Sequence, residues 1–138
     1  MILLDDSQSL EIALEARGPA GTQAASDFRL KVAVVCPAFS GSNDTVWIEG
    51  FEWNRFMGDL RKLEQSRRGE AIITAMSPND FQFRIFAADS AGHMIAEGWV
   101  GRDYYSVQSM AKEHHVSFGI EIDPSTLPML IQQFETLT

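Results

Sequence analysis

The segment from Val116 to Phe134 most constrains the fold of this chain, because a strand pattern there runs directly into a helix pattern. Apolar residues occupy every second position from Val116 to Ile122, which places one apolar face on an extended strand. Asp123 and Pro124 come next, and both are favoured in the first positions of a helix. Apolar residues then recur at helical spacing, at Leu127, Leu130, Ile131 and Phe134. Two apolar faces joined by one short turn predict a helix that packs on a sheet.

The length and composition predict a single globular domain, residues 1–138. A chain of 138 residues buries roughly two-thirds of its unfolded surface in one core. Its 45% hydrophobic and 22% charged residues are those of an ordinary folded protein. The formal net charge of −8 disfavours binding to nucleic acid, because a phosphate backbone would be repelled. We therefore expect no nucleic-acid partner.

Neither a targeting segment nor a membrane anchor is predicted. The opening Met1–Leu4 is a short apolar stretch, followed by Asp5 and Asp6 without a basic flank. No run approaches the roughly 18 apolar residues that a membrane-spanning helix needs. Cys36 is the only cysteine, so no disulfide framework is expected. These features predict a cytoplasmic protein with no membrane partner.

The first 50 residues predict strands. Alternating apolar residues indicate strands over 9–17 and 27–36, and the residues around Gly18 and Pro19 form a turn between them. Residues 40–44 are predicted to form a loop, and residues 45–48 a short third strand. We expect the strand over 9–17 to form an edge of its sheet.

A helix is predicted from Gly50 to Ser66. Its apolar residues fall on one stripe, at Trp53, Phe56, Met57, Leu60 and Leu63. The opposite side carries charges that alternate in sign at three- and four-residue spacing, at Glu52, Arg55, Asp59 and Lys62. The pattern predicts a helix with one buried and one solvated side.

The second half returns to strand patterns. Strands are predicted over 70–76, 80–88 and 93–102, with a tight hairpin from Asp89 to Gly92. Residues 110–115 form a polar lead-in to the final strand. The strands lack the regular alternation with helices that a parallel sheet requires. We therefore predict an α+β fold: a mainly antiparallel sheet of six to seven strands with two amphipathic helices packed on one face.

No motif predicts a metal site, a cofactor or a catalytic residue. Glu113, His114 and His115 are possible zinc ligands by type, but adjacent residues on an extended segment point in opposite directions. Ser109 and Lys112 match a serine acyl-enzyme pattern without its supporting motifs. A carboxylate pair for acid–base chemistry stays open, since such pairs have no fixed spacing in sequence.

Partner-binding residues are predicted where the strand over 93–102 ends. Asp103, Tyr104 and Tyr105 follow that strand, and we expect them to lie in a polar connection that also contains Glu113. Tyrosine is favoured at the centres of protein interfaces. These four residues are the predicted contact surface for a protein partner.

Residues 50–138 resemble a group of small bacterial proteins of uncharacterised function that includes the WapI-like immunity proteins. The resemblance lies in the helix over 51–60, the hairpin over 89–94, the strand over 118–123 and the closing helix from Leu127. It implies a protein that binds and neutralises a contact-dependent toxin, and it assigns no site residue.

Three functions remain open at this stage. The first is a non-enzymatic immunity protein that covers the active site of a basic toxin, such as a nuclease. The second is a small enzyme or ligand-binding domain with a pocket between the sheet and the first helix, lined by His93, Glu97 or Arg102. The third is a structural dimer that pairs through an exposed strand edge.

Overall fold

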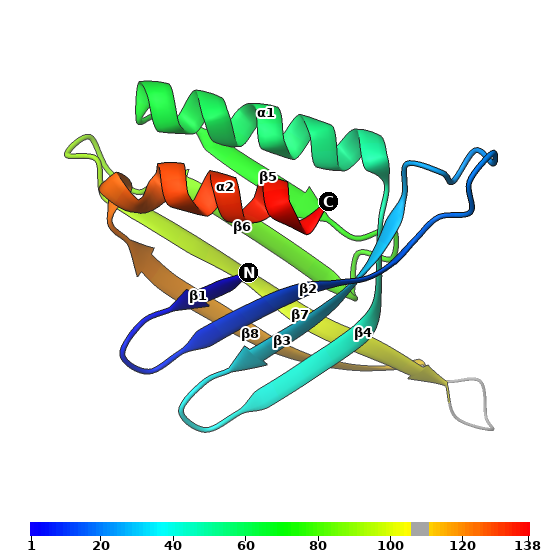
Figure 1. Ribbon diagram of the computed structural model, residues 1–138. Coiled ribbons are helices and arrows are strands. Elements are labelled where there is room, and N and C mark those ends of the chain that lie inside the picture. The colour runs from blue at the N-terminus through cyan, green and yellow to red at the C-terminus, as the bar shows by residue number, and fades with distance from the viewer. Residues whose placement is uncertain (106–110) are drawn as a thin grey trace.

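The chain folds into eight strands and two α-helices in the computed structural model, which describes residues 1–105 and 111–138 except the side chains of Ile2, Leu4, Tyr105, Ala111 and Lys112 (Figure 1). The predicted α+β class is confirmed. A single 3-10 turn, η1, precedes the second helix. The elements are β1 (Ile2–Leu4), β2 (Ser9–Arg17), β3 (Phe28–Val35), β4 (Ser40–Ile48), α1 (Gly50–Ser66), β5 (Glu70–Thr74), β6 (Phe81–Ala87), β7 (Met94–Tyr105), β8 (Ala111–Ile122), η1 (Pro124–Thr126) and α2 (Leu127–Leu137).

The strands form two antiparallel sheets of four, ordered β1-β2-β3-β4 and β5-β6-β7-β8. Helix α1 separates the sheets along the chain, and within each sheet every strand pairs with its neighbours in sequence. The short strand β1 was not predicted. It pairs with β2 from Ile2↔Glu11 to Leu4↔Ser9, so Ser9–Arg17 is an inner strand. The prediction that Ser9–Arg17 forms a sheet edge was therefore wrong.

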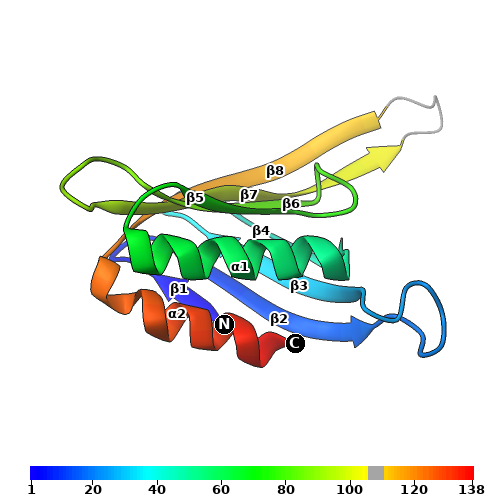
Figure 2. The same cartoon turned by 90° about the horizontal axis from the view of Figure 1, so that it is seen from above.

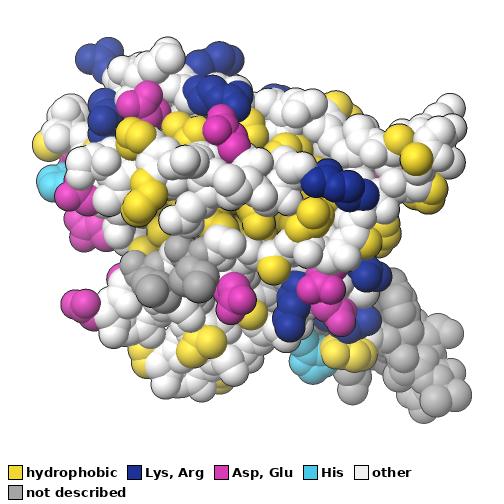
Figure 3. Space-filling model, viewed as in Figure 1, with side chains coloured by type: hydrophobic (Ala, Val, Ile, Leu, Met, Phe, Trp, Pro, Cys, Tyr) yellow, Lys and Arg dark blue, Asp and Glu magenta, His cyan; other side chains and the backbone are white. Residues whose placement is uncertain are grey.

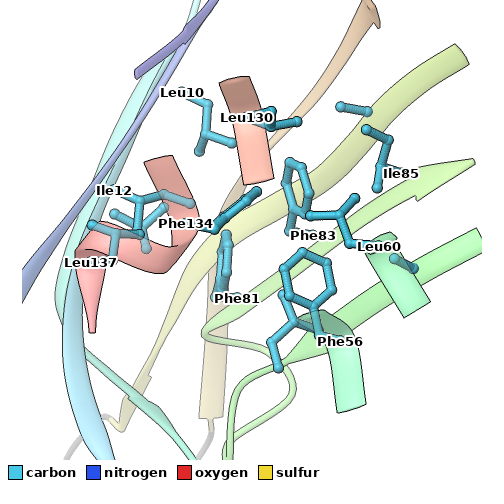
Figure 4. Close-up of a cluster of buried hydrophobic side chains, with 14 of the residues drawn as sticks. Leu10, Ile12, Phe56, Leu60, Phe81, Phe83, Ile85, Leu130, Phe134 and Leu137 are labelled. Carbon is cyan, nitrogen blue, oxygen red and sulfur yellow. The ribbon is translucent and has the colours of Figure 1, made fainter. Parts of the chain in front are cut away.

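Both helices lie on the same side of the β5–β8 sheet (Figure 2). Phe134 of α2 is central to the core: its ring centroid is 5.2 Å from that of Phe56 in α1 and 5.6 Å from that of Phe83 in β6. Leu10 and Ile12 of β2 close the other side of this cluster (Figure 4). Nine residues from both helices and the second sheet are buried and form the main core: Trp53, Phe56, Leu60, Phe81, Phe83, Phe118, Ile120, Leu130 and Phe134.

Strand β4 begins at Ser40, although residues 40–44 were predicted to form a loop. Ser40 and Gly41 pair with Val35 and Val34 of β3. Small and polar residues tolerate an extended backbone where a partner strand supplies the hydrogen bonds, and composition does not reveal that partner. The pairing shifts register near Asn43, which turns this side chain into the protein.

The ends of β7 and β8 form a projecting ribbon, which we call the arm and define as residues 101–105 and 111–115. The prediction that β7 ends at residue 102 and that residues 111–115 lie outside the last strand was wrong. The two strands pair in register from Met94↔Ile122 to Tyr105↔Ala111. The arm extends beyond the body of the protein in both views (Figures 1 and 2). Its hydrogen-bonded pairing holds polar residues in strands where their sequence suggested a loop.

Candidate functional site

The predicted partner-binding residues come together on the arm. Asp103 lies directly opposite Glu113, and Tyr104 lies opposite Lys112. Because side chains alternate along a strand, Asp103 and Glu113 share one face and Tyr104 belongs to the other. The side chain of Tyr105 lies outside the described residues. The four residues therefore lie on one ribbon with two different faces, and not in the loop that the sequence suggested.

The outer face of the arm, turned away from the helices, is built against the turn between β5 and β6. The backbone N–H of Gly101 donates to the carbonyl oxygen of Asp80 at 2.9 Å, and the indole Nε1 of Trp99 donates to that of Pro78 at 3.3 Å. A Cβ atom at position 101 would lie 2.5 Å from the carbonyl oxygen of Asn79. Glycine is required there because the turn approaches the strand this closely.

Asn79 joins the turn to both carboxylates of the arm. Its Nδ2 donates to Oε1 of Glu113 at 3.0 Å and lies 3.4 Å from Oδ2 of Asp103. A hollow of about 230 Å³ lies beside this contact. It is lined by Asn79, Trp99, Asp103, Glu113, His114 and His115. We call it the outer hollow.

The outer hollow carries crowded negative charge. Burial raises the pKa of the neighbouring Asp80, the charge of Asp103 raises it further, and Arg102 partly offsets both effects. Oδ1 of Asp103 is buried and has no hydrogen-bond partner among the described residues. A buried carboxylate oxygen without a donor is unfavourable, so the carboxylate of Asp103 is only partly satisfied by its surroundings.

The inner face of the arm forms a second depression, of about 500 Å³, against the start of β4. Ser40 and Ser42 lie on one side of it, and Arg102, Tyr104 and His114 on the other. The rings of Tyr104 and His114 meet edge to face, with centroids 5.2 Å apart. Tyr104 is nevertheless 53% exposed. An exposed aromatic ring on a supported strand is suited to contact with another protein.

Basic side chains lie over α1 and also beside the arm, as Figure 3 shows. Arg61 binds Glu135 of α2 at 2.7 Å, and Lys62 binds Asp59 at 3.2 Å.

Among the residues that the structure describes, no helix is both long and apolar enough to span a membrane.

Of the three residues named for an enzyme or ligand-binding pocket, Arg102 lines the depression of about 500 Å³ on the inner face of the arm, which is formed with β4 and not with the first helix. Met94 and Arg102 are eight residues apart on one strand, or about 26 Å. His93 binds Asp89 at the far hairpin, and Glu97 binds Arg84 on the outer face of the sheet. His93, Glu97 and Arg102 therefore cannot line one cavity.

The possible metal and serine motifs do not assemble a site in the described part of the chain. His114 and His115 lie on opposite faces of β8, as their adjacency predicted. Across residues 1–105 and 111–138, no three His, Cys, Asp or Glu side chains gather in a way that would hold a metal ion. Ser109, with the side chain of Lys112, lies outside the described residues.

A comparison with protein families identifies the chain. The model of the "Immunity protein WapI-like family" matches residues 1–138, which is the whole sequence. This chain belongs to the WapI-like immunity protein family. The match confirms the resemblance seen over residues 50–138 and extends it to the first sheet. No curated protein and no solved structure gave a significant match to this WapI-like chain.

Sequence reasoning missed two residues that line the outer hollow, Asn79 and Trp99, and also Gly101, which lets the turn approach the strand. The turn at Pro78 and Asn79 was recognised, but its distance to the arm depends on tertiary structure. One signal was present, since a glycine inside a strand often marks a close backbone approach, and Gly101 follows this rule.

Proposed function

We propose that this WapI-like protein neutralises a protein toxin by binding to it and covering its active site, without catalysis of its own. The observation that carries the proposal is the family match over residues 1–138. We propose the arm as the contact surface, with Asp103, Tyr104, Tyr105 and Glu113 as the residues that bind the toxin.

The position of the arm supports this assignment. Its paired strands extend beyond the body, so a partner has access to both of their faces (Figure 2). Tyr104 offers an exposed ring on one face of the arm, and Glu113 is exposed on the other face. Tyrosines and charged groups of this kind contribute strongly to protein interfaces when a partner excludes water from them.

The edge of the second sheet also supports the arm as the contact surface. β8 is the edge strand of its sheet, and Gln8 hydrogen-bonds both backbone groups of Gly119, at 2.7 and 3.2 Å. Farther along, the backbone of β8 continues into the arm. An edge strand presents N–H and C=O groups to which an extended segment of a partner can pair.

The charge of the chain favours a basic partner. A net charge of −8 attracts a positively charged toxin and accelerates its association. Nucleases that bind a phosphate backbone carry such positive surfaces. A basic nuclease is therefore the toxin class that we propose, and the cytoplasm is the compartment, in keeping with the free thiol of Cys36.

A protection experiment tests the proposal. Candidate toxic domains, taken from the genes that neighbour the gene for this chain, are expressed in bacteria under inducible control, with and without the chain. We expect growth only with the chain, and a purified complex that weakens as salt concentration rises. Cell death in both cultures, together with no complex at low salt, would contradict the proposal.

A further inference from the structure

The outer hollow is a defined feature of the fold and not a chance gap between side chains. Two backbone hydrogen bonds hold its walls: Gly101 N–H to Asp80 at 2.9 Å, and, on the adjoining turn, Asp80 N–H to Ser77 at 2.9 Å. The absence of a side chain at Gly101 lets the turn lie against the strand. The indole of Trp99 is fixed to the same turn through Pro78. The lining groups are therefore held in place before any partner arrives.

The hollow has unused hydrogen-bond acceptors. Asp103 lines it, and its Oδ2 has only a long contact of 3.4 Å with Nδ2 of Asn79. Glu113 accepts one bond from Asn79, through Oε1. The amide of Asn79 is neutral, so it does not offset the negative charges of Asp103 and Glu113. The described lining contains two histidines but no lysine or arginine, so a cationic side chain of a partner would add a donor with a permanent charge.

The volume and the lining residues of the hollow restrict which cationic hydrogen-bond donor can bind there. Small-molecule sites are commonly about 300–1,000 Å³. The outer hollow, at about 230 Å³, is smaller and fits one side chain. Trp99 provides an aromatic wall beside the two carboxylates. A flat cation that stacks on an indole and donates to two carboxylates matches these groups best.

We propose that the outer hollow is a pocket for one arginine side chain of a partner protein. Its guanidinium group stacks on Trp99 and donates hydrogen bonds to Asp103 and Glu113. This proposal rests on the proposed function for the identity of the partner. The pocket gives the basic toxin one specific point of contact.

Arginine fits this pocket better than lysine. A guanidinium group has donors in a rigid planar fork, which can reach two carboxylates at once. Asp103 and Glu113 are directly opposite each other on neighbouring strands, so their oxygens face the same space. An ammonium group would satisfy one carboxylate at a time and would stack less well on the ring.

A titration without any toxin tests the pocket. ¹⁵N-labelled full-length protein is titrated with N-acetyl-arginine amide, and the indole N–H resonance of Trp99 is followed, assigned with Trp99→Phe. We expect a saturable shift with a Kd on the order of 1–10 mM, as suits a single side chain. N-acetyl-citrulline amide has nearly the same shape but no charge, and we expect it to produce no saturable shift.

Two variants test whether the arginine derivative binds in the outer hollow. Asp103→Asn and Glu113→Gln keep the shape of their side chains, and each should weaken the arginine derivative by at least about fivefold. Glu97→Gln is the matched control, because Glu97 lies on the same face of β7 and already binds Arg84 at 2.9 Å. It should leave the Kd unchanged. Equal shifts with the citrulline derivative, or a Kd unaltered by Asp103→Asn, would overturn the proposal.

The outcomes separate the pocket from the proposed function. Protection from the toxin without a saturable shift at Trp99 would refute the pocket alone. A saturable, Asp103-dependent shift without protection would refute the immunity function and leave the pocket in place.

Discussion

Asn43 in β4 donates from Nδ2 to the backbone carbonyl oxygen of Gly101 in β7, at 2.8 Å, and so joins the first sheet to the base of the arm. Its Oδ1 accepts from the backbone N–H of Thr45 at 2.9 Å and from the Thr45 hydroxyl at 2.8 Å. Asn43 is 1% exposed. A buried amide with both ends bonded fixes its surroundings, because every alternative position would leave polar groups unpaired.

Replacing Asn43 with Ala should therefore destabilise the protein. We expect the free energy of unfolding to fall by about 2–3 kcal/mol in urea, because the carbonyl of Gly101 and the N–H of Thr45 lose their partner. Asn54→Ala, at an exposed position of α1, is the control, and it should change the free energy of unfolding by less than about 0.5 kcal/mol. A similar small loss for Asn43→Ala would mean that water replaces the amide without cost.

Phe134→Ala should destabilise the protein more than Asn43→Ala, because the Phe134 ring of α2 packs against both α1 and the second sheet. We expect a loss of about 3–5 kcal/mol in the free energy of unfolding, as for other buried aromatic residues. Phe51 is 64% exposed, so Phe51→Ala should have little effect. If urea unfolding gave equal losses for the two variants, the placement of α2 against α1 would be wrong.

The core was predictable because burial leaves a periodic signal in the sequence. The bounds of β2 and α1, Ser9–Arg17 and Gly50–Ser66, match the predicted segments. Asp123 accepts a hydrogen bond from the backbone N–H of Ser125 at 2.9 Å and caps the turn that leads into α2. In each case the same residues favour the secondary structure locally and form the face that is buried in the fold. The prediction from sequence therefore agrees with the tertiary structure.

The arm was not predictable in the same way. Solvent surrounds much of it, so its residues have no apolar alternation to mark them as strands. Its strand structure depends on pairing between residues such as Arg102 and His114, which polar composition does not reveal. The outer hollow depends in addition on a turn about 20 residues upstream of Trp99, and such contacts appear only in three dimensions. Asp103 and Glu113 were nevertheless chosen by residue type, and they prove to be neighbours.

The hairpin between β6 and β7 should show a pH-dependent ion pair. Nδ1 of His93 lies 2.5 Å from Oδ2 of Asp89. This contact raises the pKa of His93 above its usual 6.5 and, with backbone hydrogen bonds, lowers the pKa of Asp89 below 3.8. Stability from the raised histidine is present below pH 6.5 and is lost as pH rises through the raised pKa. Stability from the lowered aspartate is lost as pH falls through its own pKa.

An NMR titration of His93 checks this pair. We expect a His93 pKa above that of an unpaired histidine in the wild-type protein, and a return to the usual range in Asp89→Asn. An identical His93 pKa in both proteins would show that the contact does not form in solution.

We propose that residues 1–138 unfold as one domain, because side chains from both sheets and both helices share one core (Figure 4). Fluorescence of the tryptophans and far-ultraviolet circular dichroism should give the same urea midpoint. Trp53 reports on the core and circular dichroism on all elements. Two separated transitions would instead indicate that the sheets unfold independently.

The affinity of the toxin domain for Tyr104→Ala tests most directly whether the arm is the toxin-binding surface. Tyr104 is exposed on the arm, and Met129, 57% exposed on α2, supplies the control variant Met129→Ala. By calorimetry, Tyr104→Ala should weaken binding by about 30-fold or more, as loss of a central interface tyrosine does. Met129→Ala should bind like the wild type. Unchanged affinity for Tyr104→Ala, with a large loss for Met129→Ala, would place the toxin on the helices and contradict the account.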